Sequence, residues 1–150
     1  MTSFEAATVA ELDALEDIER HSFARPTSRE AFVAELGRDQ ARIYIARERG
    51  RVVGFCNVWI VVDELHVLSV AIHPDHRRAG LGARLLAHVL DAARATGCSV
   101  ATLEVRRGNR PAIALYERAG FHTVNIRAGY YQDNHEDALV MLLALTPRDR

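Results

Sequence analysis

Arg77-Arg78-Ala79-Gly80-Leu81-Gly82, at the centre of the stretch from Val70 to Tyr116, lies between an apolar strand pattern and an amphipathic helix pattern. The two glycines leave the backbone N–H groups of this turn with little side chain around them, directly before a helix. Amides at a helix N-terminus bind anions because they point at the ligand and because the helix dipole favours negative charge. The turn is therefore a candidate phosphate-binding loop, although the same glycines would also suit a helix entry that binds nothing.

The residues on either side of this turn predict a buried strand and a helix. Before it, an apolar run from Val67 to Ile72 is broken by His73-Pro74-Asp75, which predicts a strand that ends in a turn. After it, apolar residues recur at helical spacing until Gly97, which favours the left-handed C-terminal cap of a helix. The apolar face consists of Leu85, Leu86, Val89, Leu90 and Ala93.

Capping residues mark the other predicted helices. Thr8 and Ser28 precede two short helical patterns, the second of which ends near Gly37. Asn109 precedes a third pattern, and Gly120 closes it. Strand patterns cover residues 3–7, 41–48, 52–62, 100–105, 121–126 and 139–145. The order β-α-α-β-β-β-α-β-α-β-β predicts an α+β domain with helices on both faces of a mixed sheet.

Length and composition predict a single domain, residues 1–150, which can bury a core of its own. The formal net charge of −1 argues against the long-range positive field of proteins that bind nucleic acids or anionic membranes. Cys56 and Cys98 stand in or beside apolar runs, so we expect both to be reduced core residues. The N-terminus lacks a signal-peptide pattern and no apolar run could span a bilayer, so we expect a cytoplasmic protein.

The sequence argues against two other kinds of ligand site. The glycine loop has no following Lys-Ser or Lys-Thr and no third glycine, so it matches neither a Walker loop nor a dinucleotide fingerprint. His66, His73 and His76 are close in sequence, but their spacing matches no common zinc arrangement, so we expect no metal site. The first helix carries acidic residues that we expect on a solvated face, namely Glu16, Asp17 and Glu19.

A set of motifs resembles the acetyl-CoA-binding core of the GNAT superfamily of N-acetyltransferases. The motifs are Val70-Ala71-Ile72, Arg77 to Ala83, Leu103-Glu104-Val105-Arg106, Asn109 and Ala114-Leu115-Tyr116-Glu117 to Gly120-Phe121. Within the superfamily the chain resembles the RimI type, which acetylates the N-terminal alanine of a small-subunit ribosomal protein. This narrower resemblance is carried by Glu104-Val105-Arg106, Asn109, Ala112 to Glu117, Arg127 with Tyr130-Tyr131, and Glu136-Asp137-Ala138.

The resemblance implies a fold, a co-substrate and an acceptor. The fold is a mostly antiparallel central sheet in α/β/α layers, the co-substrate is acetyl-CoA, and the acceptor is the peptide N-terminus of a ribosomal protein. We expect such an enzyme to be a monomer or a weak dimer. One departure concerns the acceptor, because Thr27 stands where the RimI pattern commonly has tryptophan between proline and serine. This departure puts the acceptor sequence preference in question.

The resemblance also implies which residues bind the co-substrate. Backbone groups of Val70, Ala71 and Ile72 would hold the pantetheine arm in the manner of an added strand. Asn109 would fix the co-substrate near its reactive end. The residues expected around the pyrophosphate are Arg77, Arg78, Ala79, Gly80, Leu81, Gly82 and Ala83.

The resemblance matches Glu104 to the general base and Tyr116 to the general acid, and it favours a place for Tyr130 and Tyr131 in the peptide groove. With a reference pKa of about 8, only roughly one α-amine in ten is neutral at pH 7, so a carboxylate that removes its proton is useful. The departing thiolate needs a proton, which a phenol can supply. Each residue also has an ordinary alternative, since a strand glutamate is often solvated and a helical tyrosine is often half-buried core.

Other functions stay open at this point. The same fold could acetylate a small amine or a lysine side chain, although at a reference pKa of about 10.4 fewer than roughly one lysine in a thousand is neutral at pH 7. A non-catalytic acyl-CoA-binding module is a further class. Such a module could keep the loop from Arg77 to Ala83 without Glu104 and Tyr116, both of which this chain has.

Overall fold

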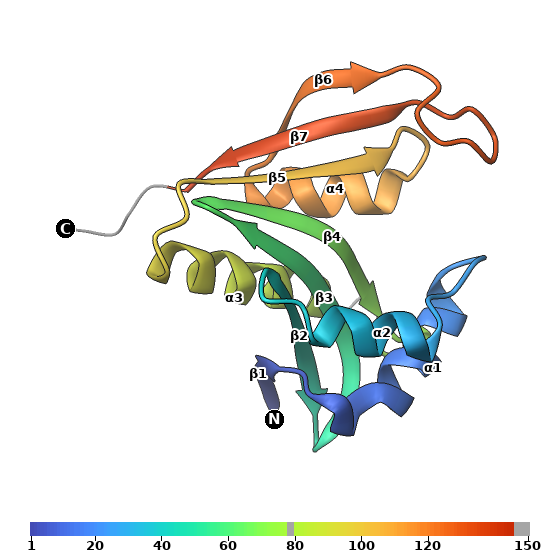
Figure 1. The fold of residues 1–150 in the computed structure, drawn as a ribbon, viewed down its shortest axis with the longest axis vertical. Helices are drawn as coiled ribbons and strands as arrows, with labels where there is room; N and C mark the ends of the chain where they lie inside the picture. The colour runs from blue at the N-terminus through green and yellow to red at the C-terminus, as the bar shows by residue number, and fades with distance from the viewer. Residues whose placement is uncertain (78–79, 146–150) are drawn as a thin grey trace.

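A computed structural model describes residues 1–77 and 80–145 and arranges them around one seven-stranded sheet (Figure 1). The strands are β1 (Thr2–Ala6), β2 (Ala41–Glu48), β3 (Arg51–Val61), β4 (Glu64–Ile72), β5 (Val100–Arg106), β6 (His122–Arg127) and β7 (Ala138–Ala144). Their order across the sheet is β1-β2-β3-β4-β5-β7-β6, and only β4 and β5 pair in parallel. The predicted mixed, mostly antiparallel sheet is confirmed.

The helices begin and end at the residues that the sequence marks. They are α1 (Leu12–Ser22), α2 (Arg29–Leu36), α3 (Leu81–Ala95) and α4 (Arg110–Ala119), with 3₁₀ turns η1 (Val9–Glu11) and η2 (Pro74–His76). Thr8 forms a capping box with Glu11, and the Ser28 side chain accepts a hydrogen bond from the Ala31 amide. Gly97 and Gly120 have φ angles of 93° and 108°. This is the left-handed conformation in which helices commonly end, and glycine adopts it without steric cost.

Two hydrophobic cores lie on opposite faces of the sheet, as the predicted layers require. On one face, α3 and α4 cover the sheet through Leu85, Leu86, Val89 and Tyr116. On the other face, α1 and α2 pack on β2 and β3. The large buried side chains of this second core are Leu15, Ile18, Phe32, Ile43, Ile45 and Phe55. Both cysteines are buried and free, as expected, and burial raises the pKa of the Cys56 thiol to about 12. No helix within 1–77 and 80–145 is long and apolar enough to cross a membrane.

The sheet divides between β4 and β5. These strands pair only from Glu64–Val100 to Val67–Leu103, and beyond that point β5 pairs with β7 alone. At the same place β4 carries an extra residue, Leu68, because Asn57 pairs with Ser69 while Val58 pairs with Val67. Such a bulge bends a strand, and Figure 1 shows β4 turning away from β5 toward α1 and α2. The second half of β4 therefore has a free edge.

Candidate active site

The free edge of β4 presents backbone groups at the predicted pantetheine-binding residues. The His73 amide donates to the Val53 carbonyl of β3 at 2.7 Å. Because backbone groups of successive strand residues point to alternate sides, those of Val70 and Ile72 face away from β3, whereas those of Ala71 face β3. An extended ligand can therefore add beside β4 through Val70 and Ile72.

The glycine loop leads from this edge into the N-terminus of α3. Gly80 has a φ of 73° and precedes α3 as its N-cap, with no side-chain cap on the first-turn amides. Arg77 contacts the protein itself, because its Nε donates to the Ile72 carbonyl at 2.8 Å and its Nη2 donates to Ser22 Oγ at 3.2 Å. Two of the seven residues predicted to bind pyrophosphate, Arg78 and Ala79, lie outside the described residues. The uncapped helix start fits a diphosphate.

Gly82 lies inside the first turn of α3, at an ordinary helical φ. A Cβ built on Gly82 would be 3.7 Å from the Ile72 side chain and 3.8 Å from Leu115, which is ordinary contact. Neither backbone conformation nor packing among residues 1–77 and 80–145 therefore requires glycine at this position. A closely approaching ligand would require it.

Asn109 lies at the N-terminus of α4, where its Oδ1 accepts a hydrogen bond from the Ala112 amide at 3.3 Å. The predicted helix cap is thus confirmed. The preceding residue is held as well, since the Gly108 amide donates to Glu136 Oε2 at 2.7 Å. These contacts fix the start of α4 beside the end of β5 and the loop between β6 and β7.

Glu104 is the centre of a polar cluster at the split of the sheet. On β5 the predicted alternation is confirmed, with Ala101, Leu103 and Val105 buried and Glu104 exposed. The Tyr130 hydroxyl donates to Glu104 Oε1 at 2.8 Å, and Arg127 Nε pairs with Glu104 Oε2 at 3.0 Å. The hydrogen bond to the Glu104 carboxylate raises the pKa of Tyr130. The structure thus brings Glu104 together with two residues that follow it by 23 and 26 positions in the sequence.

Tyr131 and Tyr116 lie deeper than Tyr130. The two loop tyrosines meet edge to face, with ring centroids 5.1 Å apart, and the Arg106 guanidinium stacks 3.9 Å from the Tyr131 ring centroid. Tyr116 on α4 is 6% exposed and packs edge to face on Phe121. Burial raises the pKa of Tyr116, with smaller contributions from Cys56 and Tyr131, so its phenol keeps its proton at neutral pH.

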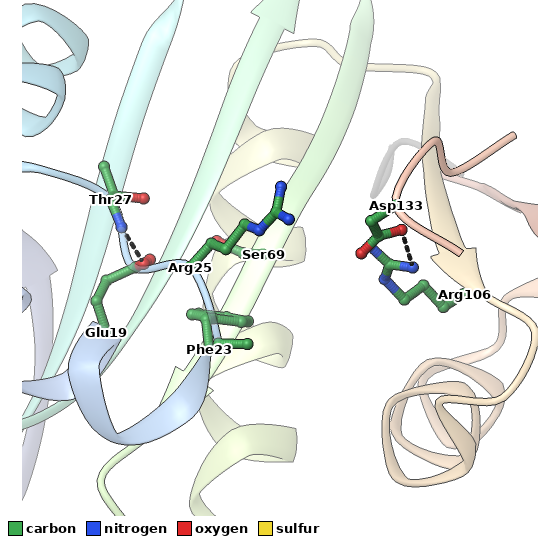
Figure 2. Close-up of a pocket in the computed structure, with 8 residues that line it drawn as sticks. Glu19, Phe23, Arg25, Thr27, Ser69, Arg106 and Asp133 are labelled. Atoms are coloured by element: carbon green, nitrogen blue, oxygen red, sulfur yellow. Dashed lines mark hydrogen bonds and ion pairs between the residues drawn. The ribbon is translucent and has the colours of Figure 1, made fainter. Parts of the chain in front are cut away.

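A pocket of about 400 Å³ opens beside this cluster (Figure 2). Its walls come from α1, the loop between α1 and α2, β4, β5 and the loop between β6 and β7. The lining residues are Glu19, Phe23, Ala24, Arg25, Thr27, Ser69, Arg106 and Asp133. Figure 2 shows the Arg106–Asp133 pair across the pocket from Glu19 and Thr27, so charged groups of both signs line the pocket.

Glu19 was expected on a solvated helix face, but the structure shows that it is buried and lines the pocket. It is 5% exposed instead of solvated, and its Oε1 accepts a hydrogen bond from the Thr27 amide at 2.8 Å. The bond fixes the loop that carries Thr27 over the pocket. Its position four residues after Leu15, on the apolar face of α1, is a sequence signal that could have indicated burial. Asp133 offered no such signal.

Comparison with known proteins finds relatives of nearly the whole chain. Residues 10–121 match the family described as the acetyltransferase (GNAT) family. The chain is 34% identical over 148 residues to the ribosomal protein bS18-alanine N-acetyltransferases of Escherichia coli K12 and Salmonella typhimurium, covering 97% of this chain and 99% of each relative. The crystal structure of the Escherichia coli ribosomal-protein-S18-alanine N-acetyltransferase superposes with a TM-score of 0.90 at 33% identity, covering 100% of this chain and 97% of that one.

Proposed function

The chain belongs to the acetyltransferase (GNAT) family, and we propose that its acceptor is the N-terminal α-amine of ribosomal protein bS18, at an alanine. The enzyme is an N-acetyltransferase that uses acetyl-CoA. The observation that carries the acceptor proposal is the extent of the likeness, because enzymes named for this acceptor match this chain from end to end. The matched segments include every wall of the pocket beside Glu104.

In this proposal the co-substrate lies along the free edge of β4 and over the start of α3. Backbone groups of Val70 and Ile72 hold the pantetheine arm, with Ala71 between them, and Asn109 holds the end near the thioester. The pyrophosphate is bound by the loop residues Arg77, Arg78, Ala79, Gly80, Leu81, Gly82 and Ala83. The uncapped helix start and the unexplained glycine at position 82 support this placement.

The acceptor peptide enters the pocket beside Glu104, Tyr130 and Tyr131. Glu104 removes a proton from the α-ammonium group, directly or through a water molecule, and the neutral nitrogen attacks the thioester carbonyl carbon. A new C–N bond forms, the nitrogen loses its second proton to solvent, the C–S bond breaks, and the sulfur leaves as a thiolate. Tyr116 gives its proton to that thiolate and regains one from solvent, and Glu104 releases to solvent the proton that it took. No covalent acyl-enzyme is required.

The contacts of Glu104 set a condition on this reaction. Both carboxylate oxygens are already engaged, one by Tyr130 and one by Arg127. An incoming amine, or the water that relays its proton, must therefore share or replace one of these partners. We infer that the Tyr130 hydroxyl is the partner replaced, because Tyr130 lies on the loop between β6 and β7, whereas Arg127 belongs to β6.

We also propose that residues 1–150 act as one acetyltransferase domain in the cytoplasm, where ribosomal proteins are made. Two separate unfolding transitions would contradict the proposal that residues 1–150 form one domain. A single cooperative unfolding transition by circular dichroism and by tyrosine absorbance is the expected result.

Mass spectrometry of peptides incubated with enzyme and acetyl-CoA tests the acceptor. We expect one added acetyl group on a peptide with the first residues of bS18, and slower addition when its alanine is replaced by serine, glycine or methionine. The matched control is the same peptide with a blocked N-terminus and an internal lysine. Acetylation of that control at a comparable rate would contradict the proposal and favour lysine or small-amine acceptors.

A further inference from the structure

Three side chains that bind metals in many proteins meet at the end of α1, outside the pocket and the glycine loop. Asp17 and His21 are four residues apart and so lie on one face of α1, and His73 follows β4. One ligand atom from each residue lies within 4.8 Å of the other two. The sequence gives no sign of this meeting, because 52 positions, from 21 to 73, separate the two histidines.

The distances suit a small ion after a modest side-chain adjustment. His73 Nε2 lies 3.5 Å from Asp17 Oδ2, and one ligand atom of His21 lies within 4.8 Å of one from each of these two residues. Ligands at about 2.0–2.2 Å from a tetrahedral ion are roughly 3.4 Å apart, so the first pair already has this spacing. The imidazole rings of His21 and His73 have centroids 5.0 Å apart. Small rotations about side-chain bonds would bring the ligand nitrogens of His21 and His73 to the spacing that a tetrahedral ion requires.

The hydrogen bonds of both imidazoles assign Nε2 of each ring to the ion. His21 Nδ1 lies 2.8 Å from the Asp17 backbone oxygen, which can only accept, so a neutral His21 has its proton on Nδ1 and its lone pair on Nε2. His73 Nδ1 accepts from the Asp75 amide at 3.2 Å, which leaves the ring proton on Nε2. An ion therefore takes this Nε2 only when the proton moves to Nδ1, where the Asp75 carboxylate, whose Oδ2 lies 3.7 Å away, accepts it in place of the lost amide contact. Such outer partners are common around metal-bound histidines.

We propose that Asp17, His21 and His73 form a binding site for one divalent transition-metal ion of the Zn²⁺ class. Two imidazoles and one carboxylate are the ligand set that Zn²⁺ takes, whereas Mg²⁺ and Ca²⁺ prefer oxygen ligands alone. The fourth position is open to water, since the His21 and Asp17 side chains are 48% and 38% exposed. His73, at 12% exposed, is the anchored member of the set.

A bound ion would compete with a neighbouring positive charge, Arg20, for the Asp17 carboxylate. Arg20 Nη2 donates to Asp17 Oδ1 at 3.2 Å and has to turn outward, which its exposed side chain permits. His76, whose ring centroid is 6.1 Å from that of His73, pairs with Glu48 and is outside the ligand set. The bound ion would replace one arginine contact with three metal–ligand bonds.

The ion would join α1 to the segment that enters the glycine loop. Arg77 already links the same parts, since it bonds both Ile72 at the end of β4 and Ser22 at the end of α1. Binding at Asp17, His21 and His73 adds a second link one turn away. The site therefore couples the helix that precedes the acceptor pocket to the strand that precedes the phosphate loop.

Isothermal titration of the untagged, chelator-treated full chain with Zn²⁺ alone tests the site. We expect one saturable site per chain, and affinity at least about tenfold weaker in His21→Ala and in Asp17→Asn, since even outer partners contribute tenfold. The matched control is His66→Ala, which removes an exposed histidine that pairs with Glu64 elsewhere in the sheet. It should leave the affinity unchanged.

Visible absorption of the Co²⁺ form separates a built site from loose binding. Strong d–d bands at one equivalent, lost in His21→Ala, are the expected signature of a low-coordinate site with nitrogen ligands. His21 is exposed, so its replacement by alanine should leave the melting temperature of the metal-free chain unchanged. Absence of saturable binding, or equal weakening by His21→Ala and His66→Ala, would overturn the proposal.

Discussion

At the scale of single residues, Tyr116 is set apart from the other tyrosines by its burial between α4 and the sheet. Burial raises its pKa, because a phenolate would be poorly solvated there. The phenol therefore holds its proton throughout the neutral range. It is therefore available as a donor when the C–S bond breaks, but the raised pKa makes the transfer uphill, because a thiol has an ordinary pKa of only about 8.5.

Tyr116→Phe should lower kcat about 10²-fold while the KM for acetyl-CoA changes little, because the ring stays and only the proton donor is lost. Steady-state kinetics with varied acetyl-CoA measures both. Tyr44→Phe is the matched control, since Tyr44 is a half-buried tyrosine whose pKa burial also raises. Equal changes in kcat and KM for Tyr116→Phe would mean that this tyrosine has only a structural role.

Glu104→Gln should lower kcat about 10²-fold near pH 7, because an amide cannot accept the amine proton. The loss should shrink as the pH rises above about 8, where the acceptor α-amine is already neutral. A kcat/KM profile between pH 6 and 9.5 shows this. The base assignment fails if the ratio of wild-type to variant activity is constant over that range.

At the scale of elements, the start of α3 joins fold and function. Gly80 gives the left-handed turn that the entry into α3 needs, whereas no contact within the described chain requires glycine at position 82. The two glycines of one motif therefore serve different purposes. Gly80 is needed for the backbone conformation, and we propose that Gly82 is needed so that the ligand can approach the helix closely.

Gly82→Ala should separate binding from stability. Alanine in place of helical glycine should raise the free energy of unfolding by up to about 1 kcal/mol. Its methyl group should also push the pyrophosphate from the amides, and loss of one charge-assisted hydrogen bond, about 1.5–3 kcal/mol, corresponds to a roughly 10- to 100-fold higher KM for acetyl-CoA. Chemical denaturation and kinetics measure the two effects.

Gly37→Ala is the control for Gly82→Ala, because Gly37 ends α2 at an ordinary φ of −90° and does not line the pocket beside Glu104. It should leave the KM for acetyl-CoA unaltered. If the KM for acetyl-CoA is also unaltered in Gly82→Ala, the phosphates do not bind at the start of α3.

Element boundaries were largely predictable from the sequence because their signals are local. Thr8, Ser28 and Asn109 cap helices through amides two or three residues away, and Gly97 and Gly120 end helices through their own φ angles. The bulge at Leu68 was not predictable in this way. It exists only as a register shift between β3 and β4, and nothing in the apolar run around it interrupts the strand pattern.

At the scale of the whole molecule, contacts between distant segments assemble the candidate site. Glu104, Tyr130 and Tyr131 were predicted through the family resemblance, and the structure places them together without testing their roles. The burial of Glu19 and the approach of His73 to Asp17 follow from packing of α1 on the sheet. The helical spacing of Glu19 from Leu15 could have indicated its burial, but the approach of His73 to Asp17 depends on the assembled fold, and no spacing within the chain reports it.

Acidic residues tie the loop between β6 and β7 to the rest of the molecule. The Arg106 side chain lowers the pKa of Asp133, and the backbone amides of Gly108 and Gly129 lower those of Glu136 and Asp137. A carboxyl group with a lowered folded-state pKa stabilises the fold above its unfolded value. That stabilisation is lost as the pH falls through the folded value.

The melting temperature should therefore fall as the pH drops below the ordinary values of 4.5 for Glu136 and 3.8 for Asp133 and Asp137. Glu136→Gln should melt at a lower temperature than wild type at pH 7, and the difference should narrow toward pH 3. Glu30→Gln, at an exposed position on α2, is the control and should follow wild type. Calorimetry from pH 3 to 7 measures this, and parallel curves for wild type and Glu136→Gln would refute it.

The most direct measurement is a crystal structure with a conjugate in which coenzyme A is joined through an acetyl bridge to the α-amine of a bS18 N-terminal peptide. The account predicts phosphate oxygens at the amides that begin α3, the bridge between Tyr116 and Glu104, and the peptide in the pocket lined by Thr27 and Asp133. Phosphates bound away from α3, or a peptide that leaves the bridge on another side of the sheet, would contradict it.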